Sequence, residues 1–391
     1  MNDFIVLLNK SEGKTSASSL SCVKRNVNKK VGHTGTLDKF ASGLLIALTG
    51  RYTKFTEKYM NLEKTYLATI EFGKETDTLD SEGVVVAKSD NIVNKADLER
   101  ILKTKFSGKI KQTPPIYSAL KINGKRSSDR VRNGEDVNLP EREITVYSSE
   151  IVSFDNNIAV IRFTVSRGTY IRSLARDIAL TLNSRGYLKK LVRERIGIFD
   201  INDSVKDSDY DVFKTEYNNQ SSDEYIMCIG VFDGVHIGHQ KILSETVKTA
   251  HERGCKSLVI TFDKSPKGRN GLMTLEEKIS AISNFKPDKI EVLKWNEQLS
   301  STSGAQFMLS LQKKYNIRGI VHGKDFSVGS RLNQVSAKDL GLFFSDKDIF
   351  CIDDVGCRDV ARVSSTYIQT LIKEGKTKEA SSLMFLTKSV N

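Results

Sequence analysis

Alternation of apolar and polar residues along the first part of the chain predicts short strands. An apolar run from Phe4 to Leu8 comes first, and four alternating segments follow between turn residues, at 66–72, 84–87, 144–152 and 158–165. A period of two places every second side chain on the same face of a strand. Helical spacing of apolar residues predicts helices at 15–28, 95–104 and 170–182. This mixed order predicts an α+β domain around an antiparallel sheet.

The pattern changes after residue 205. The residues from Asp203 to Glu224 are polar and acidic and have no apolar periodicity, which is typical of a linker. Beyond them, strands and helices are predicted to alternate, at 225–231, 238–253, 257–262, 274–285 and 289–293. Strand, helix and strand in succession predict the parallel sheet of an α/β domain. We therefore expect one domain over 1–205, a linker over 206–223 and a second domain over 224–391.

Length and charge agree with two domains of different character. At 391 residues the chain is too long for one ordinary hydrophobic core. The net charge of +12 is shared unevenly, because residues 1–205 hold 34 Lys and Arg against 24 Asp and Glu. Clustered basic residues neutralise phosphates, so the first half is the half expected to bind nucleic acid.

Cysteines and the N-terminus exclude several classes of protein. The five cysteines are odd in number, scattered and without CxxC spacing, which argues against a disulfide framework or a structural zinc site. The apolar run at the N-terminus is short, and no stretch is long enough to span a bilayer. These features predict a soluble protein of the reducing cytoplasm that makes no membrane contact.

The most informative segment is GHTGTLDKFASGLLIALTG, from Gly32 to Gly50, which places the carboxylate of Asp38 on a turn before an apolar stretch. Three more segments follow it, KTYLATIEFGKETDT from residue 64, QTPPIYSALKINGKR from residue 112 and SRGTYIRSLARDI from residue 166. Together they closely resemble the TruB family of tRNA pseudouridine synthases. The resemblance implies that the first domain isomerises uridine in tRNA, at position 55 of the T-arm, and needs no cofactor.

Three catalytic residues follow from this resemblance. Asp38 matches the carboxylate that acts near the sugar and the uracil ring as a nucleophile or a base. Whether it attacks the ring, attacks the sugar or removes a sugar proton stays open. Tyr66 matches the tyrosine that stacks on the flipped base, and Arg172 matches the arginine that keeps the aspartate ionised and oriented.

Three further matches concern binding of the RNA and its extruded base. His33 matches the residue associated with base extrusion, Lys10 the lysine of the first motif, and Leu191 an apolar residue of the pocket. Each residue also has an ordinary structural interpretation, such as a turn aspartate, a packed tyrosine, a locally paired arginine or a hydrogen-bonded loop histidine. The family usually has proline where this chain has Ser11 and Lys39, and this loss removes no reactive group.

A second motif follows the predicted linker. In CIGVFDGVHIGHQKIL, from Cys228 to Leu243, a strand leads into a glycine turn, then to HxGH at His236 and His239, and then to a helix. Two imidazoles beside a helix N-terminus suit an anionic phosphate. With GLMTLEEKISAI from residue 271, RGIVHGKDFSVG from 318 and RVSSTYIQTLIKEGKTKEASSLM from 362, this motif resembles the FAD synthetase domain of the bacterial riboflavin kinase/FAD synthetase family.

This second resemblance implies a Rossmann-like nucleotidyltransferase fold of the HxGH type. In that family the phosphate of FMN attacks the α-phosphorus of ATP, with Mg²⁺ on the polyphosphate. The implied partners of the whole chain are tRNA, ATP and FMN, without an obligate protein partner. The implied nucleotide-binding residues are Gly230, Phe232, Asp233, Gly234, His236, Gly238, His239, Ser364, Ser365 and Thr366.

Two departures keep the role of the second domain open. Gln369 stands where the family has an arginine that meets phosphate, and Lys264–Ser265 stands where it usually has Pro-His. A neutral amide does not replace a guanidinium, although Lys264, Arg269 or Arg331 could supply the charge. Three hypotheses therefore remain: a working FMN adenylyltransferase, a decayed synthetase that binds RNA or nucleotide, and a structural tail.

Overall fold

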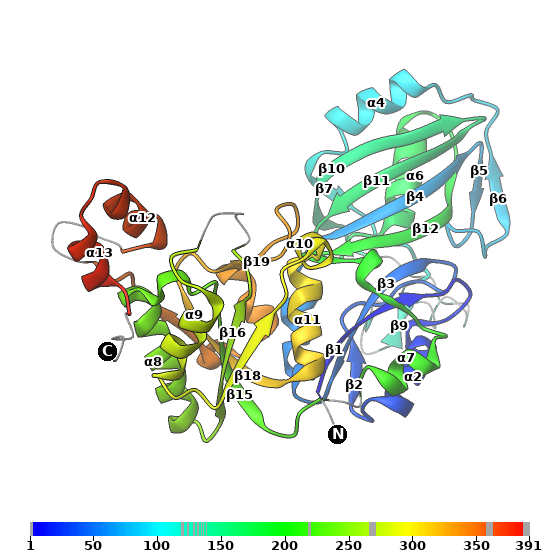
Figure 1. Cartoon of the computed structure of the whole chain (residues 1–391). Coiled ribbons are helices and arrows are strands. Elements are labelled where there is room, and N and C mark those ends of the chain that lie inside the picture. The colour runs from blue at the N-terminus through cyan, green and yellow to red at the C-terminus, as the bar shows by residue number, and fades with distance from the viewer. Residues whose placement is uncertain are drawn as a thin grey trace. The chain divides into compact units, whose positions relative to one another are not determined.

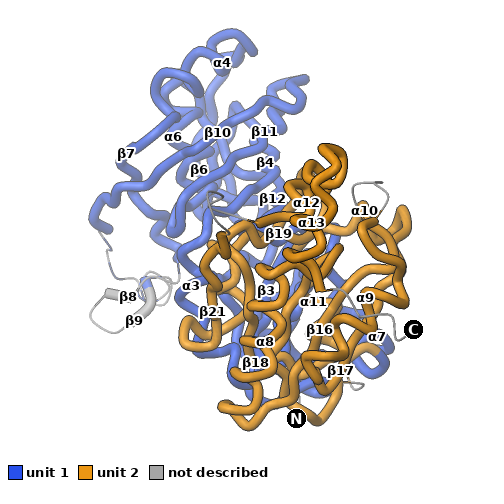
Figure 2. Tube along the Cα trace, turned by 60° about the vertical axis from the view of Figure 1, so that its left-hand side comes forward, with its two compact units in different colours: residues 1, 3–215 blue, residues 2, 216–391 orange. Residues whose placement is uncertain are grey.

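The structure, a computed structural model, describes residues 3–118, 121–122, 125–127, 139–217, 220–265, 271–356 and 363–385, with single residues at 130, 133, 135 and 137. The chain divides into two compact units, Asp3–Thr215 and Glu216–Asn391 (Figure 2). Each unit is built around a sheet of its own, and we describe the two separately.

A ten-stranded sheet forms the first unit (Figure 1). Its strands are Ile5–Lys10 (β1), Val31–His33 (β2), Ser42–Thr49 (β3), Lys64–Phe72 (β4), Gly108–Gln112 (β7), Arg142–Asp155 (β10), Ile158–Val165 (β11), Gly186–Ile196 (β12), Phe199–Asp200 (β13) and Val205–Lys206 (β14). The order is β14-β1-β3-β12-β4-β11-β10-β7, with β2 paired to β3 and β13 to β12. Only the pairs β1–β14 and β3–β12 of these described strands are parallel. The predicted α+β domain with an antiparallel sheet is confirmed.

Short helices connect these strands and cover the sheet. They are Ser16–Ser19 (α1), Ser21–Asn26 (α2), Thr56–Met60 (α3), Lys95–Thr104 (α4), Ile171–Thr181 (α6) and Tyr210–Thr215 (α7), with 3-10 helices at Gly50–Phe55 (η1) and Ile201–Asp203 (η2). Two small hairpins pair Lys74–Thr76 (β5) with Val85–Lys88 (β6) and Lys121–Ile122 (β8) with Lys125–Arg126 (β9). Helix α6 packs on β4 and β12, and α4 packs on β10, so that together they enclose the apolar core.

The single helix predicted over 15–28 is wrong in one respect, because it divides at Leu20 into α1 and α2. The amide of Leu20 bonds to the carbonyl of Ala17, three residues earlier, which tightens the chain into a 3-10 turn. Serine side chains compete for backbone hydrogen bonds and weaken helices, and this segment reads SASSLS.

The segment predicted as a linker contains structure that belongs to the first unit. Strand β14 pairs with β1, which places Val205 beside Leu8 and Lys206 beside Asn9. Helix α7 packs against α2, and the Phe213 side chain is fully buried. Two isolated buried rings, Phe213 and Tyr217, among polar residues produce no periodic pattern, which is why the composition alone suggests a linker.

Five parallel strands form the sheet of the second unit, which confirms the predicted α/β class. The strands are Glu224–Ile229 (β15), Lys256–Phe262 (β16), Lys289–Leu293 (β17), Asn316–Gly323 (β18) and Ile349–Ile352 (β21), in the order β17-β16-β15-β18-β21. A small hairpin pairs Ser327–Val328 (β19) with Val335–Ser336 (β20). The order reverses between β15 and β18, and ligands of such sheets bind beyond the carboxyl ends of the strands at that point.

The helices of the second unit alternate with these strands. They are Ile237–Glu252 (α8), Leu275–Ser283 (α9), Glu297–Ser301 (α10), Gly304–Lys314 (α11), Ser365–Lys373 (α12) and Thr377–Leu383 (α13), with 3-10 helices at Asp233–Val235 (η3), Ala337–Leu342 (η4) and Asp346–Asp348 (η5). Within the described ranges, no helix is long and apolar enough to cross a bilayer. The cysteines described in the structure are free thiols, at Cys22, Cys228, Cys255 and Cys351.

A chain shortened to residues 1–204 is expected to unfold at a lower temperature than a chain of residues 1–217. The shorter chain lacks β14 and the buried Phe213 side chain, and loss of one buried aromatic ring typically costs about 3–5 kcal/mol. Thermal unfolding followed by circular dichroism measures the difference. Equal midpoints would show that residues 205–217 contribute nothing to the first unit.

Candidate active sites

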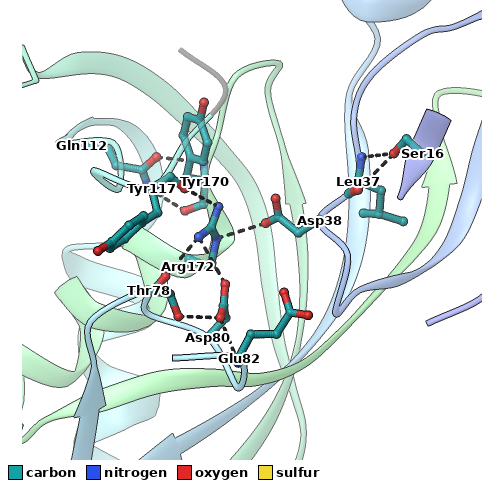
Figure 3. Close-up of polar contacts among 10 residues, drawn as sticks. All are labelled: Ser16, Leu37, Asp38, Thr78, Asp80, Glu82, Gln112, Tyr117, Tyr170 and Arg172. Carbon is teal, nitrogen blue, oxygen red and sulfur yellow. Dashed lines mark hydrogen bonds and ion pairs between the residues drawn. The ribbon is translucent and has the colours of Figure 1, made fainter. Parts of the chain in front are cut away.

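Arg172 joins two carboxylates in the first unit (Figure 3). It lies in the first turn of α6, and its side chain is 6% exposed. Its Nε lies 3.0 Å from Oδ2 of Asp38, and its Nη1 lies 3.2 Å from Oδ2 of Asp80. Nη1 also donates to the carbonyl of Thr78 (3.0 Å), and Nη2 donates to that of Tyr117 (3.1 Å). The guanidinium is therefore fixed by the protein and turns its Nε edge toward Asp38.

Asp38 is the carboxylate of this group that a substrate can reach. Its side chain is 39% exposed, whereas that of Asp80 is 6% exposed. Its contact with Arg172 is an ion pair without an aligned hydrogen bond, since Nε–H has no acceptor at a good angle. An ion pair of this kind orients the carboxylate.

Asp80 is not among the residues that the motifs single out. Its Oδ1 accepts the hydroxyl of Thr78 (2.6 Å) and the amide of Glu82 (3.0 Å). Burial raises the pKa of Asp80, while the bond from Thr78 and the charge of Arg172 act in the opposite direction. The residue ends the run TDTLD after the second motif, but a carboxylate in a turn is common and gave no distinct signal.

Backbone contacts hold the aspartate loop, which we define as residues 34–41. The hydroxyl of Ser16 donates to the carbonyl of Leu37 (3.0 Å) and accepts its amide (2.8 Å), as Figure 3 shows. The amide of Gly13 donates to the carbonyl of Lys39 (2.9 Å). Both neighbours of Asp38 are thus tied to the chain between the end of β1 and the first residue of α1.

Lys10 makes a third contact of this kind. Its side chain is completely buried, and Nζ donates to the carbonyls of Ser11 (3.0 Å), Lys14 (2.6 Å) and Lys39 (3.4 Å). Burial lowers the pKa of Lys10 to about 8. Its predicted role in RNA binding stays a prediction, and the contacts in the structure are with the backbone that carries Asp38.

Arg193 on β12 holds the same part of the chain from another side. Its side chain is 2% exposed, with Nε donating to the carbonyl of Leu44 (2.7 Å) and Nη2 to that of Gly35 (3.2 Å). Strands β3 and β12 come unusually close at Gly43, where φ is +112° and a Cβ would lie 2.5 Å from the carbonyl oxygen of Arg193. Only glycine fits at this position.

The remaining predicted residues of the first unit lie near the aspartate loop. Tyr66 on β4 is partly buried against the apolar core, and Leu191 on β12 is 4% exposed within it. Leu37 and Phe40, on either side of Asp38, belong to the same core. His33 ends β2, and its Nδ1 accepts the amide of Gly35 (3.4 Å). Burial, followed by the charge of Arg193, lowers the pKa of His33, so its ring is neutral at neutral pH.

The second candidate site follows strand β15, where the backbone adopts unusual conformations. Phe232 and Val235 have positive φ angles of 51° and 35°, and Gly234 lies between them with φ of 73°. Left-handed conformations are costly for bulky and β-branched residues, and such strain gathers at functional sites. The absence of a side chain at Gly230 lets the Phe232 ring pack against the backbone of residue 230, since a Cβ on residue 230 would lie 3.0 Å from atoms of that ring.

His236 and His239 lie together at the N-terminus of α8. Nδ1 of His236 accepts the amide of His239 (3.4 Å), and the two rings stack with centroids 3.6 Å apart. The Phe232 ring meets His239 edge-on at 5.3 Å. At Gly238 a Cβ would lie 3.3 Å from the ring of His236, so a small residue suits the stack. The 16-residue helix directs its positive end toward this pair of imidazoles.

The Ser364–Thr366 segment begins a helix beside the same turn. The hydroxyl of Ser364 caps α12 by accepting the amide of Tyr367 (3.2 Å), and that of Ser365 donates to the carbonyl of Asp233 (3.0 Å). Oδ1 of Asp233 accepts the amide of Leu272 (2.7 Å), which adds the segment before α9. Burial raises the pKa of Asp233. Three sequence motifs therefore meet at one turn.

Only some of the residues that could contact a phosphate group lie within the described parts of the chain. Thr366, Lys264 and Arg331 are exposed, and Gln369 is half-buried on α12. Arg269 and Arg362 lie outside the described residues. Within the described parts of the chain, no group of three or more His, Cys, Asp or Glu side chains is placed to hold a metal ion.

Sequence comparisons match both halves of the chain to known families. Residues 24–171 match the N-terminal domain of TruB family pseudouridylate synthases, and residues 218–366 match FAD synthetase. The tRNA pseudouridine synthase B of Borreliella afzelii is 44% identical over 208 residues, which cover 52% of this chain and 73% of that protein. The chain belongs to the TruB family of pseudouridylate synthases.

Other relatives of this TruB-family enzyme extend the match. The tRNA pseudouridine synthase B of Clostridium kluyveri is 40% identical over 261 residues, covering 63% of this chain and 89% of that protein. Among solved structures, one in a Cbf5-Nop10-Gar1 complex is 25% identical with a TM-score of 0.42, covering 54% of this chain and 55% of that one. By its family match the first unit is a pseudouridine synthase, and the second unit contains the match to the FAD synthetase family.

Replacing Asp80 by Asn in the TruB-family unit is expected to lower the rate of pseudouridine formation about tenfold or more. The substitution keeps the shape but removes one of the two charges paired with Arg172, and a hydrogen bond to a charged group contributes about 1.5–3 kcal/mol. Single-turnover assays on a uridine-containing RNA measure the rate. Asp90→Asn, at an exposed position, is the matched control, and an equal rate for both variants would contradict the expectation.

Proposed function

We propose that the first unit converts uridine to pseudouridine in tRNA, at position 55 of the T-arm. The observation that carries this proposal is the buried guanidinium of Arg172, which presents one accessible carboxylate, Asp38. Family membership supplies the reaction, and the relatives named tRNA pseudouridine synthase B support the substrate. The excess of basic residues in the first half supports RNA binding.

The proposed reaction places Asp38 at its centre. Uracil must leave the sugar at its nitrogen, rotate and rejoin through carbon, so a group near both rings has to act as nucleophile or base. Arg172 orients Asp38 for this step through their ion pair. Tyr66 stacks on the flipped base and assists the proton transfer that restores the aromatic ring, while Leu191 supplies an apolar wall.

Base extrusion is assigned to the edge of the same site. An extruded uridine leaves a gap in the stacked T-loop that the enzyme must fill or brace. The His33 ring is neutral and partly exposed, so it can enter a base stack without stripping water from a charge. Lys10 contributes by holding the loop, and any direct contact with RNA requires the loop to open.

Asp38→Asn is expected to abolish pseudouridine formation in a T-arm stem-loop while RNA binding stays within about tenfold of the unaltered protein. The amide has almost the same shape but is neither a nucleophile nor a base. Tritium release from the labelled uridine measures turnover, and filter binding measures affinity. A stem-loop with cytidine at position 55 is the substrate control. Turnover by the Asn variant would remove Asp38 from the catalytic role.

We also propose that the second unit transfers AMP from ATP to FMN. An oxygen of the FMN phosphate attacks the α-phosphorus, the bond to the β-phosphate oxygen breaks, and pyrophosphate leaves. The rings of His236 and His239 stack at the start of α8, and this supports a role for them and for the helix amides in stabilising the negative charge that develops. Mg²⁺ would enter on the polyphosphate of ATP as part of the substrate.

The remaining predicted residues shape and line this proposed nucleotide site. Gly230, Phe232, Asp233, Gly234 and Gly238 form the turn before and into α8. Ser364, Ser365 and Thr366 begin α12, where hydroxyl and amide groups can donate to phosphate oxygens.

Gln369 favours a second candidate function, a decayed synthetase that binds nucleotide or RNA. The side chain is a neutral amide on α12 where the family carries an arginine that meets phosphate. Lys264 and Arg331, which could replace that charge, are exposed. The two candidates differ in whether the second unit turns over ATP.

His239→Ala is expected to lower FAD formation about a hundredfold, because one preorganised donor to the transition state is lost. Pseudouridine formation should not change, which makes it the internal control. The assay incubates the protein with ATP, Mg²⁺ and FMN and measures FAD and pyrophosphate.

Gln369→Arg separates the two candidates in the same assay. An active unaltered protein whose rate is kept or raised by the arginine supports the transferase. ATP binding without FAD formation, with activity gained by Gln369→Arg, supports the decayed synthetase. Absence of ATP binding by either protein would contradict the nucleotide site itself.

A further inference from the structure

Asp207 makes a set of contacts that its place in an acidic, polar segment does not suggest. Its carboxylate is 0% exposed. Oδ1 accepts the hydroxyl of Ser11 (2.7 Å) and the ammonium of Lys14 (3.1 Å), and Oδ2 accepts the hydroxyl of Ser19 (2.6 Å). The amide of Asp207 also donates to the carbonyl of Asn9 (3.2 Å). One buried residue thus fixes the chain between β1 and α2.

The segment that Asp207 fixes is also the segment that holds the aspartate loop. We call residues 10–16 the first-motif turn. Its Gly13 amide and Lys10 ammonium donate to the carbonyl of Lys39, and its Ser16 hydroxyl makes two hydrogen bonds with Leu37. The turn therefore lies between Asp207 on one side and both neighbours of Asp38 on the other.

We propose that Asp207 is a positioning residue for Asp38, which acts by fixing the first-motif turn. This proposal rests on the pseudouridine synthase activity of the first unit. Family members usually carry a proline where this chain has Ser11, and a proline ring restricts the backbone covalently. Here a hydrogen bond from Ser11 to a buried carboxylate supplies the restriction instead.

Because Asp207 lies near the Lys10 ammonium, its proposed role should affect how the activity depends on pH. The charged groups that face the Lys10 ammonium are Asp207, Asp38, Arg193 and Glu12. Burial lowers the pKa of Lys10 to about 8, and the charge of Asp207 is the largest influence that raises it. Burial of Asp207 is outweighed by bonds from Ser19, Ser11 and Lys14, which together lower the pKa of its carboxyl, so Asp207 stays ionised over the working range.

Loss of the Asp207 charge should therefore deprotonate Lys10 at a lower pH. A neutral amine has two hydrogens for the three carbonyls that the ammonium now serves, so one of these contacts must be given up. The direction follows from the sign of the charge, because removal of a nearby anion disfavours the protonated amine. The loop around Asp38 then loosens at a lower pH than in the unaltered protein.

The test compares Asp207→Asn with Asp211→Asn in the full chain. Asp211 lies in the same segment but is exposed, so it is the matched control. We expect kcat on a T-arm stem-loop to fall about tenfold or more in Asp207→Asn with KM changed less than about threefold, since a small misplacement of a reactive group lowers rate more than binding. The alkaline limb of the kcat profile should move to lower pH in this variant only.

Several outcomes would overturn the proposal. A wild-type kcat and an unmoved alkaline limb in Asp207→Asn would do so. A lower melting temperature with unchanged kcat per folded molecule would likewise leave Asp207 with a structural role only. If Asp207→Asn does not fold, Ser11→Ala and Lys14→Met decide, because each removes one donor to the carboxylate. Unchanged kcat and pH profile in both of these variants would overturn the proposal.

Hydrogen exchange separates this inference from the proposed reaction, because it needs no turnover. Amides in peptides that cover the aspartate loop should exchange about tenfold faster in Asp207→Asn than in Asp211→Asn. If exchange responds but the unaltered protein makes no pseudouridine, the proposed function fails, while the part of the inference that Asp207 fixes the aspartate loop stands. If exchange does not respond, the positioning role fails whatever the activity.

Discussion

A guanidinium that is 6% exposed needs partners within the protein for its charge and its N–H groups, and the rest of the first site depends on how Arg172 finds them. Asp80 and the carbonyls of Thr78 and Tyr117 pair with it inside the protein. Of the two carboxylates that pair with Arg172, Asp38 is the more open to solvent, with a side chain 39% exposed against 6% for Asp80. The arrangement holds the carboxylate of Asp38 in place without burying it, so the group that the arginine orients stays accessible.

The backbone around Asp38 is fixed by cations that use carbonyl groups as acceptors. Lys10 and Arg193 are both buried, and each donates to backbone oxygens in or beside the aspartate loop. Buried cations without hydrogen-bond partners are costly. Movement of the loop carbonyls away from Lys10 and Arg193 would leave these donors unsatisfied, so the hydrogen bonds stabilise the position of the loop. Asp207 adds a carboxylate to this group from a segment far along the chain. Position and charge are therefore set by the same contacts.

Much of this architecture could be predicted from the sequence, and the failures have physical causes. The four motifs identified Asp38 and Arg172, and the structure brings them into an ion pair. Strand β3 was not predicted because residues 44–48 are buried on both faces of the sheet, and their sequence is therefore a continuous apolar run without alternation. Strand β12 was hidden because register shifts near Lys190 and Arg195 break the period of two. Asp80 and Asp207 were missed because their importance lies in partners distant in sequence, which no local pattern records.

The contact between Asp207 and Ser11 also has a consequence for the order in which the first unit folds during synthesis. The two residues are 196 positions apart, and the parallel pair β1–β14 joins the first strand of the unit to its last. During synthesis the first-motif turn leaves the ribosome long before the residue that fixes it. Contacts between distant segments form late in folding, since closing a long loop costs entropy. In a nascent first unit, the turn that contacts the aspartate loop therefore gains its hydrogen bond to Asp207 only when residue 207 has emerged and docked.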